Sequence, residues 1–192
     1  MKKTLWCELM IVAFLSFSCS PTWNTYSDNM FQGKRLLREG EYAEARNNFL
    51  KAAQAQNWSA AYAFAATASY KMGDLASAES YIMEAERLDA QHFSYVRVLG
   101  YKGLILLKEG KESQGLDALT QYIQVLRSIS SPTGARQIEV MIKRQPIDLP
   151  GLEKLIDEQV SQYESDIQQY LGTGTGFYDR PGTFRPLRSI TP

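Results

Sequence analysis

Apolar and small residues recur in three similar segments of the chain, and each segment predicts a pair of helices. The shared order is a small residue, a glycine seven positions later, a second small residue five positions after the glycine, and a large apolar residue four positions after that. These positions are Gly33, Gly40, Ala45 and Phe49; Ala66, Gly73, Ala78 and Ile82; and Gly103, Gly110, Gly115 and Leu119. Spacings of three and four residues are typical of helices, and glycine adopts the left-handed conformation that ends a helix. We therefore predict three helical hairpins, at residues 26–58, 59–95 and 96–128.

The small and large positions have different tasks in the predicted packing. The small residues let the two helices of a hairpin approach closely, while Phe49, Ile82 and Leu119 fill the layer between them. A single hairpin leaves one apolar face uncovered, so successive hairpins are expected to stack against one another.

Two further helices are predicted at residues 131–171. Pro132 suits the first position of a short helix, and apolar residues at helical spacing extend from Pro150 to Leu171. One interpretation is a capping pair that covers the open end of the third hairpin. The other is a helix that docks onto a partner or pairs with a second copy. Residues 172–192 hold four Gly and three Pro without periodicity, which predicts a flexible tail or a strap across the hairpins.

The repeated segments resemble the tetratricopeptide repeat (TPR), a helix-turn-helix unit of about 34 residues. Gly40 and Gly73 are 33 residues apart, and the resemblance covers residues 26–128. It implies an all-α fold: a right-handed α-solenoid of about three TPR units, followed by a degenerate C-terminal helix pair and an irregular tail.

The first residues have the layout of an export signal. Lys2 and Lys3 precede an apolar stretch at residues 9–17, which is shorter than the roughly 20 residues that span a bilayer as a helix. The sequence from Leu15 to Cys19 resembles the lipobox of bacterial lipoproteins, which implies cleavage before Cys19 and acylation of its thiol, for example with palmitate. We expect a signal peptide at 1–18 and an anchor linker at 19–25, with the protein in the bacterial cell envelope, at the outer membrane facing the periplasm. The alternative is ordinary cleavage after Ser18, which leaves a free thiol on a secreted or periplasmic protein.

Composition weakens several classes of function. The 192 residues include 21 Lys and Arg against 21 Asp and Glu, so the chain has no net charge to attract nucleic acid. One His and two Cys, both before residue 20, are too few for a zinc site, a disulfide framework or a His-based catalytic pair. His92 is expected at the surface. We therefore predict a protein that is not an enzyme and has no metal or cofactor.

In the TPR family the first helices of the repeats line a concave groove that binds partner proteins. The resemblance places the following residues there: Lys34, Leu37, Arg38, Ala63, Thr67, Tyr70, Lys71, Arg97, Leu104 and Lys108. Arg38, Lys71 and Lys108 are equivalent, each two residues before a turn glycine. Such cations either attract an acidic segment or complement the helix dipole, which is worth about 0.3–1 kcal/mol without any ligand.

The predicted activity is protein binding. The resemblance implies a scaffold or adaptor lipoprotein that holds a partner segment in the groove, as in the assembly of a membrane, secretion or pilus complex. The alternative is a ligand-binding accessory subunit of an envelope transport system, which predicts a deep apolar pocket with few polar groups.

Overall fold

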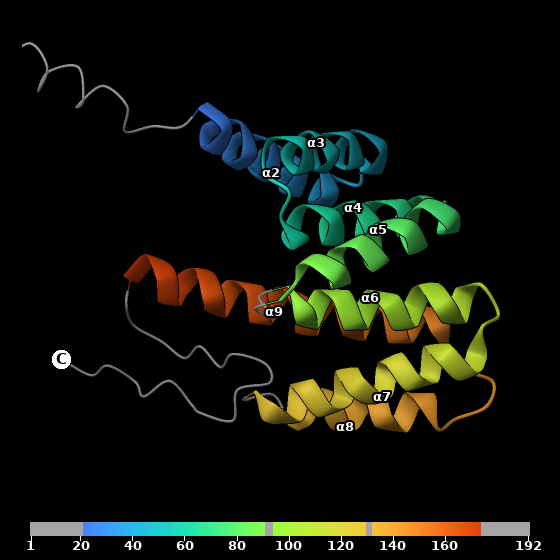
Figure 1. Ribbon diagram of the computed structural model, residues 1–192. Coiled ribbons are helices and arrows are strands. Elements are labelled where there is room, and N and C mark those ends of the chain that lie inside the picture. The colour runs from blue at the N-terminus through green and yellow to red at the C-terminus, as the bar shows by residue number, and fades with distance from the viewer. Residues whose placement is uncertain (1–20, 91–93, 130–131, 174–192) are drawn as a thin grey trace, which may run out of the picture.

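The computed structural model describes residues 21–90, 94–129 and 132–173, which form helices joined by short connections, with no strand among them (Figure 1). The all-α fold predicted from the sequence is confirmed. The predicted signal peptide, Cys19, His92 and residues 174–192 lie outside the described residues. The helices are α2 (Pro21–Glu39), α3 (Tyr42–Ala55), α4 (Ser59–Met72), α5 (Leu75–Leu88), α6 (Tyr95–Lys108), α7 (Glu112–Ser128), α8 (Pro132–Ile142) and α9 (Leu149–Thr173).

Consecutive helices pack as hairpins, and the hairpins stack in chain order. Helices α2 and α3, α4 and α5, and α6 and α7 pair most extensively, and α3 against α4 and α5 against α6 join one pair to the next (Figure 1). This arrangement is an α-solenoid, in which each unit contacts its neighbours along the chain.

The three turn glycines end their helices with the same geometry. Gly40, Gly73 and Gly110 have φ of 84°, 80° and 77°, the left-handed region that glycine occupies without a Cβ clash. The residue after each glycine donates its backbone N–H to a carbonyl five positions earlier, as in Asp74 to Ser69 at 3.0 Å. This hydrogen bond satisfies a carbonyl that the helix end otherwise leaves unpaired.

Small residues bring the two helices of a hairpin together as predicted. A Cβ added at Gly33 would lie 2.6 Å from the ring of Phe49, and one at Gly103 would lie 2.5 Å from Leu119. Phe49, Ile82 and Leu119 are buried. Any side chain larger than hydrogen at the two glycines would therefore push these helices apart.

Two boundaries differ from the sequence prediction. Helix α2 begins at Pro21, so residues 21–25 are helical and are not part of a linker. Proline is well tolerated in the first turn of a helix, where its missing N–H has no intrahelical partner. Helix α9 continues to Thr173, two residues into the segment predicted as a tail.

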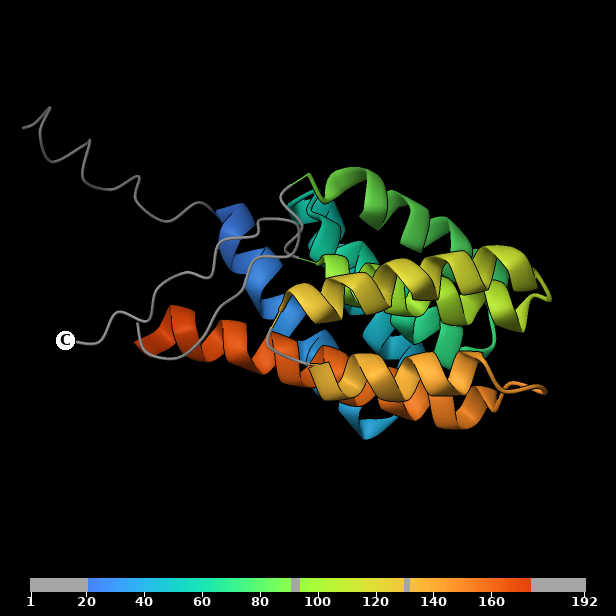
Figure 2. The ribbon, with the colours of Figure 1, turned by 90° about the horizontal axis from the view of Figure 1, so that it is seen from below.

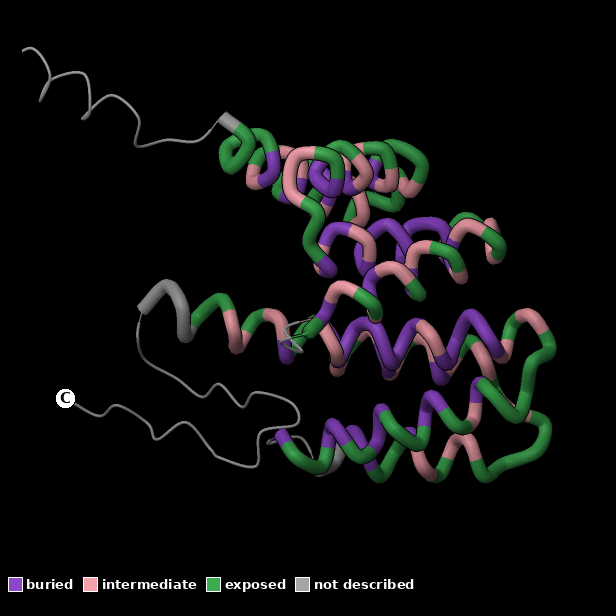
Figure 3. The backbone as a smooth tube through the Cα atoms, in the orientation of Figure 1, coloured by how far each residue is buried: buried purple, intermediate pink, exposed green. Residues whose placement is uncertain are grey.

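The C-terminal helices do not extend the solenoid in the order of the preceding pairs. Helix α8 packs on α7 and covers the end of the third hairpin, as a capping helix does. Helix α9 then packs on α6 as well as on α8, and it extends past the beginning of α6 (Figures 1 and 2). Helices α4 and α6 are buried along most of their length, whereas α2 and the last part of α9 are more exposed (Figure 3).

Candidate functional site

The predicted groove residues lie on the first helices of the three hairpins, and we call the surface formed by α2, α4 and α6 the first-helix face. Helix α9 covers the part of this face that α4 and α6 form. Its buried side chains follow one stripe of the helix: Leu152, Ile156, Val160 and Tyr163. Ile156 approaches the α6 backbone at Gly100, where an added Cβ would lie 2.8 Å from its Cγ2. Helix α9 is therefore packed into the core of the molecule.

Lys71 is the centre of one polar contact between α4 and α9. Its Nζ lies 2.5 Å from a carboxylate oxygen of Glu153 and 2.5 Å from one of Asp157. Tyr70 donates its hydroxyl to Glu153 at 2.9 Å, and Tyr101 donates its hydroxyl to Asp157. Burial alone would lower the pKa of Lys71, but the hydrogen bonds and charges of Asp157 and Glu153 outweigh it and raise that pKa. The ammonium group is thus held in its charged form by two carboxylates of α9.

Arg97 makes a second polar contact, between α6 and α9. Its guanidinium donates two hydrogen bonds to Glu164, at 2.6 and 2.9 Å, and a third to the hydroxyl of Thr67 at 2.9 Å. The guanidinium also lies 3.9 Å from the centre of the Phe64 ring. Arg97 is only 8% exposed, so water solvates its charge poorly. The bidentate ion pair with Glu164 compensates for this loss of solvation.

The tyrosines beneath α9 are held in their neutral form. Burial raises the pKa of Tyr70, and the carboxylates of Glu153 and Asp157 raise it further. Burial also raises the pKa of Tyr101 and of Tyr122. These phenols act as hydrogen-bond donors or as packing surface, since ionising them would place a second negative charge beside the acidic side chains of α9.

The remaining predicted groove residues of α4 and α6 are also occupied by contacts within the chain. Ala63 and Leu104 are fully buried in the core, and Thr67 is buried beside Arg97. The ammonium of Lys108 lies 4.4 Å from the centre of the Tyr70 ring, within the range of a cation–π contact. Helix α9 thus contacts the predicted groove residues Tyr70, Lys71 and Arg97, while Lys108 remains exposed.

The part of the first-helix face on α2 is left open by α9. Leu37 is partly buried, and Arg38 is exposed with no ion-pair partner among the described residues. The ammonium of Lys34 lies 4.7 Å from the Phe64 ring, on the ring that also contacts Arg97. Burial lowers the pKa of Lys34, while the nearby charge of Glu164 opposes this shift. The α2 part of the face therefore presents Lys34, Arg38 and Leu37 next to the part that α9 covers.

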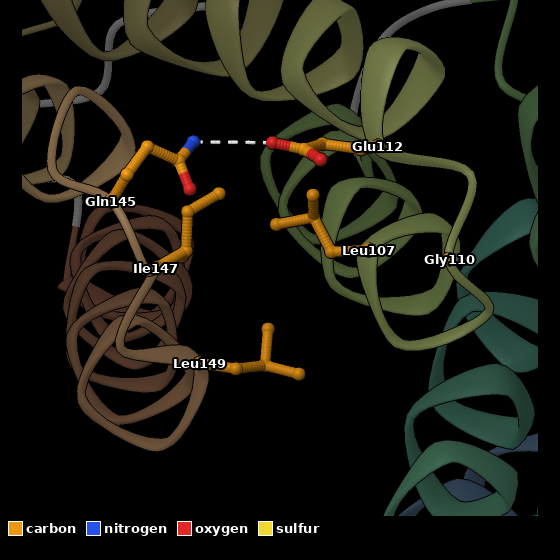
Figure 4. A pocket seen from close by; sticks show the side chains of 6 residues that line it. All are labelled: Leu107, Gly110, Glu112, Gln145, Ile147 and Leu149. Carbon is orange, nitrogen blue, oxygen red and sulfur yellow. Dashed lines mark hydrogen bonds between the residues drawn. The ribbon is translucent and has the colours of Figure 1, made fainter.

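A small pocket marks where the turn after α6 meets the connection before α9 (Figure 4). It has a volume of about 240 Å³, and its sides combine Leu107, Ile147 and Leu149 with the polar pair Glu112 and Gln145. Gln145 donates its amide N–H to Glu112 at 3.1 Å across its mouth. This mixed lining differs from the deep apolar pocket that a small-molecule binding subunit would require.

Within the described residues, no group of three His, Cys, Asp or Glu side chains is arranged to hold a metal ion. The helices of residues 21–173 that the structure describes include none with the length and apolar character to cross a membrane. In comparisons with known proteins, neither a family model nor a curated protein matches the chain. Function is therefore inferred from the contacts of the first-helix face.

Sequence reasoning missed the occupant of this face. Glu153, Asp157 and Glu164 are spaced by four and seven residues, which places three carboxylates along one side of α9. The cations Lys71 and Arg97 were both identified as groove residues. The contact could have been predicted from the sequence by pairing the acidic side of the last helix with the cations of the predicted groove.

Proposed function

We propose that this protein is a non-enzymatic scaffold of the TPR type, tethered to a bacterial envelope membrane through Cys19, that binds an acidic segment of a partner protein on its first-helix face. The observation that carries the proposal is the contact between α9 and this face. The face already holds one acidic helix, through Lys71 with Glu153 and Asp157 and through Arg97 with Glu164.

The open part of the face has the same chemistry as the covered part. Arg38 is equivalent in the repeat to Lys71, and it lacks the carboxylate partners that Lys71 has. Lys34 stands beside it near Phe64. An acidic segment of a partner would find here two cations and the apolar side chain of Leu37, a combination that favours binding through charge together with burial.

The resemblance to envelope lipoproteins with TPR units supports a role in assembling or retaining an envelope complex. A tethered chain whose binding face accepts one segment of another protein keeps that protein at the membrane. Secretion, pilus and outer-membrane machines are complexes that need such adaptors.

The test is a photo-crosslinking amino acid placed at position 38 in the intact envelope, with position 136 as the matched control. Arg136 is an exposed arginine on α8, away from the first-helix face. A partner protein crosslinked from position 38 and not from position 136 is the expected result. Crosslinking that is equal at the two positions, or that survives Lys34→Ala in the chain whose Arg38 is already replaced by the crosslinker, would overturn the proposed binding face.

The anchor is tested separately by feeding cells a palmitate analogue. The wild-type chain is expected to take up the label, and the Cys19→Ala chain is expected to lose it. Equal labelling of the two chains, or no labelling of either, would remove the lipid anchor from the proposal while leaving the binding face to its own test.

A further inference from the structure

Two half-exposed tryptophans lie together at one end of the molecule. Trp23 is 48% exposed and Trp58 is 45% exposed, and their ring centres are 5.4 Å apart. Tyr26 completes the cluster, with its ring centre 4.8 Å from that of Trp58 and 6.0 Å from that of Trp23. We call these three side chains the aromatic end. Large aromatic rings that touch each other and still face solvent form an exposed apolar patch, which in a soluble domain marks a contact surface.

Three helix termini build the aromatic end. Trp23 and Tyr26 belong to the first turns of α2, and Trp58 directly precedes α4. The end of α3 lies beside them, because Gln56 donates its amide N–H to the hydroxyl of Thr22 at 3.2 Å. Tyr26 is buried beneath the two tryptophans, and burial raises its pKa to about 12. The two tryptophans therefore pack on the buried ring of Tyr26 and remain about half exposed.

The two segments that carry the rings are uncharged. Residues 21–27 and 52–59 contain no Asp, Glu, Lys or Arg, although 22% of the chain is charged. Apart from the rings, these two segments consist of Pro, Ala, Thr, Ser, Asn and Gln. Tryptophan and tyrosine are enriched where proteins meet the headgroup layer of a membrane. Their rings bury an apolar surface there, while the indole N–H or phenol O–H forms hydrogen bonds.

The aromatic end also lies next to the proposed attachment point. Two peptide units separate Cys19 from Pro21, the first residue of α2, which limits the distance between their Cα atoms to about 7 Å. If Cys19 is held at the membrane surface by its acyl chains, then the first turn of α2 has to lie at that surface as well. The structure leaves no flexible linker of residues 21–25 that would let the domain stand away.

We propose that the aromatic end inserts into the headgroup layer of the membrane and fixes the orientation of the solenoid on its surface. The inference rests on the proposed anchor at Cys19, and it adds a second contact made by folded residues. Acyl chains alone supply affinity but leave the domain free to tumble about its attachment. Two tryptophans on a rigid helix end restrict that motion.

The tryptophan content allows a direct test. The chain has three tryptophans, and Trp6 lies in the predicted signal peptide, so the mature chain that begins at Cys19 emits only from Trp23 and Trp58. This chain is purified from cells, reconstituted into phospholipid vesicles, and compared in vesicles whose lipids carry bromine near the glycerol end of their acyl chains. Bromine quenches tryptophan only at close contact. We expect about a twofold loss of emission in the brominated vesicles, together with protection from iodide in the water.

The matched control moves the reporter to another exposed site. Met83 on α5 is 60% exposed, and Met83→Trp in a mature chain with Trp23 and Trp58 replaced by Phe reports on a surface outside the aromatic end. This control is expected to be quenched by iodide and not by the brominated lipid.

Two results would overturn the inference. One is emission from Trp23 and Trp58 that responds to iodide and lipid as the control does, which would mean that the rings face water. The other is protection from iodide without quenching by lipid, which would mean that protein covers the rings. Palmitate labelling of the same preparation reports on Cys19, so failure of the anchor and failure of the aromatic contact are read from different measurements.

Discussion

The two parts of the first-helix face differ in what their equivalent cations contact. Lys71 on α4 is clamped between Glu153 and Asp157, while Arg38 on α2 has no ion-pair partner among the described residues. Lys108 on α6 lies over the Tyr70 ring. Three residues at one repeat position thus have three environments, and the difference arises from the path of α9. The helix dipole stabilises a cation at all three positions. Of the three, only Lys71 also contacts a pair of carboxylates.

The two parts of the first-helix face are expected to serve different roles, the covered part in stability and the open part in binding. The covered part of the face contributes to the folded core, because the apolar stripe of α9 is buried there and the Arg97 side chain that pairs with Glu164 is only 9% exposed. On the open part, Leu37 packs at the edge of the core and Lys34 is half-buried, while the charge of Arg38 is exposed. Substitutions on the two parts should therefore affect different measurements.

The largest effect is expected where α9 packs most tightly. Ile156→Ala removes a fully buried side chain against Gly100 and Tyr122, so it should lower the free energy of unfolding by about 3–4 kcal/mol. Urea unfolding followed by circular dichroism measures this. Lys154→Ala, on the exposed side of the same helix, should stay within about 0.5 kcal/mol of wild type. A loss for Ile156→Ala as small as that of the control would show that α9 is only loosely docked.

A somewhat smaller effect is expected at the second ion pair. Glu164→Ala leaves the buried guanidinium of Arg97 without its carboxylate and should cost about 2–3 kcal/mol in the same assay. Glu158→Ala, an exposed acidic position on α9, provides the control. Replacing both partners, with Arg97→Met and Glu164→Leu, should recover much of the loss because no buried charge is then left unpaired. If the double variant is no more stable than Glu164→Ala, the buried charge is not the cause.

The covered part of the face should also be sensitive to alkaline conditions. The pKa of Tyr70 is raised above its ordinary value of 10, so above pH 10 the unfolded chain loses a proton that the folded chain keeps. Stability therefore falls as pH rises, by about 1.4 kcal/mol per pH unit for each such proton. The raised pKa of Lys71 acts in the same direction. Tyr70→Phe should make the decline between pH 10 and pH 12 shallower, and unfolding curves at several pH values would show an unchanged slope if Tyr70 were not involved.

The smallest effect on folding is expected at the open part of the face. Arg38→Ala should change the free energy of unfolding by less than about 0.5 kcal/mol, because the side chain is exposed and unpaired within the described residues. Lys71→Ala, at the equivalent position, should cost about 1–2 kcal/mol because it leaves two carboxylates facing each other and Tyr70. Equal losses in the two variants would contradict the distinction between the covered and open parts.

Much of the fold was accessible from the sequence because it depends on local rules. The turn glycines, the small residues at Gly33 and Gly103 and the large residue at Phe49 act between neighbouring helices, so their spacing alone determines each hairpin. Pro132 likewise marks the beginning of α8. The amphipathic stripe of α9 was also visible, and with it the need for an apolar surface to cover.

The path of α9 could not be derived in the same way. An apolar stripe specifies that a helix is buried on one side, but it does not choose between the end of the solenoid and the first-helix face. That choice depends on pairs far apart in sequence, such as Arg97 with Glu164. The aromatic end was missed for a similar reason, since Trp23 in the first turn of α2 and Trp58 directly before α4 are 35 positions apart and come together only when α2 packs beside α4.

The contact between Lys71 and Asp157 joins residues that are 86 positions apart, whereas the hairpins close between neighbours. Such distant closure costs more chain entropy and is completed later than local pairing. A chain in which α9 has not yet docked therefore presents Lys71 and Arg97 without their carboxylate partners.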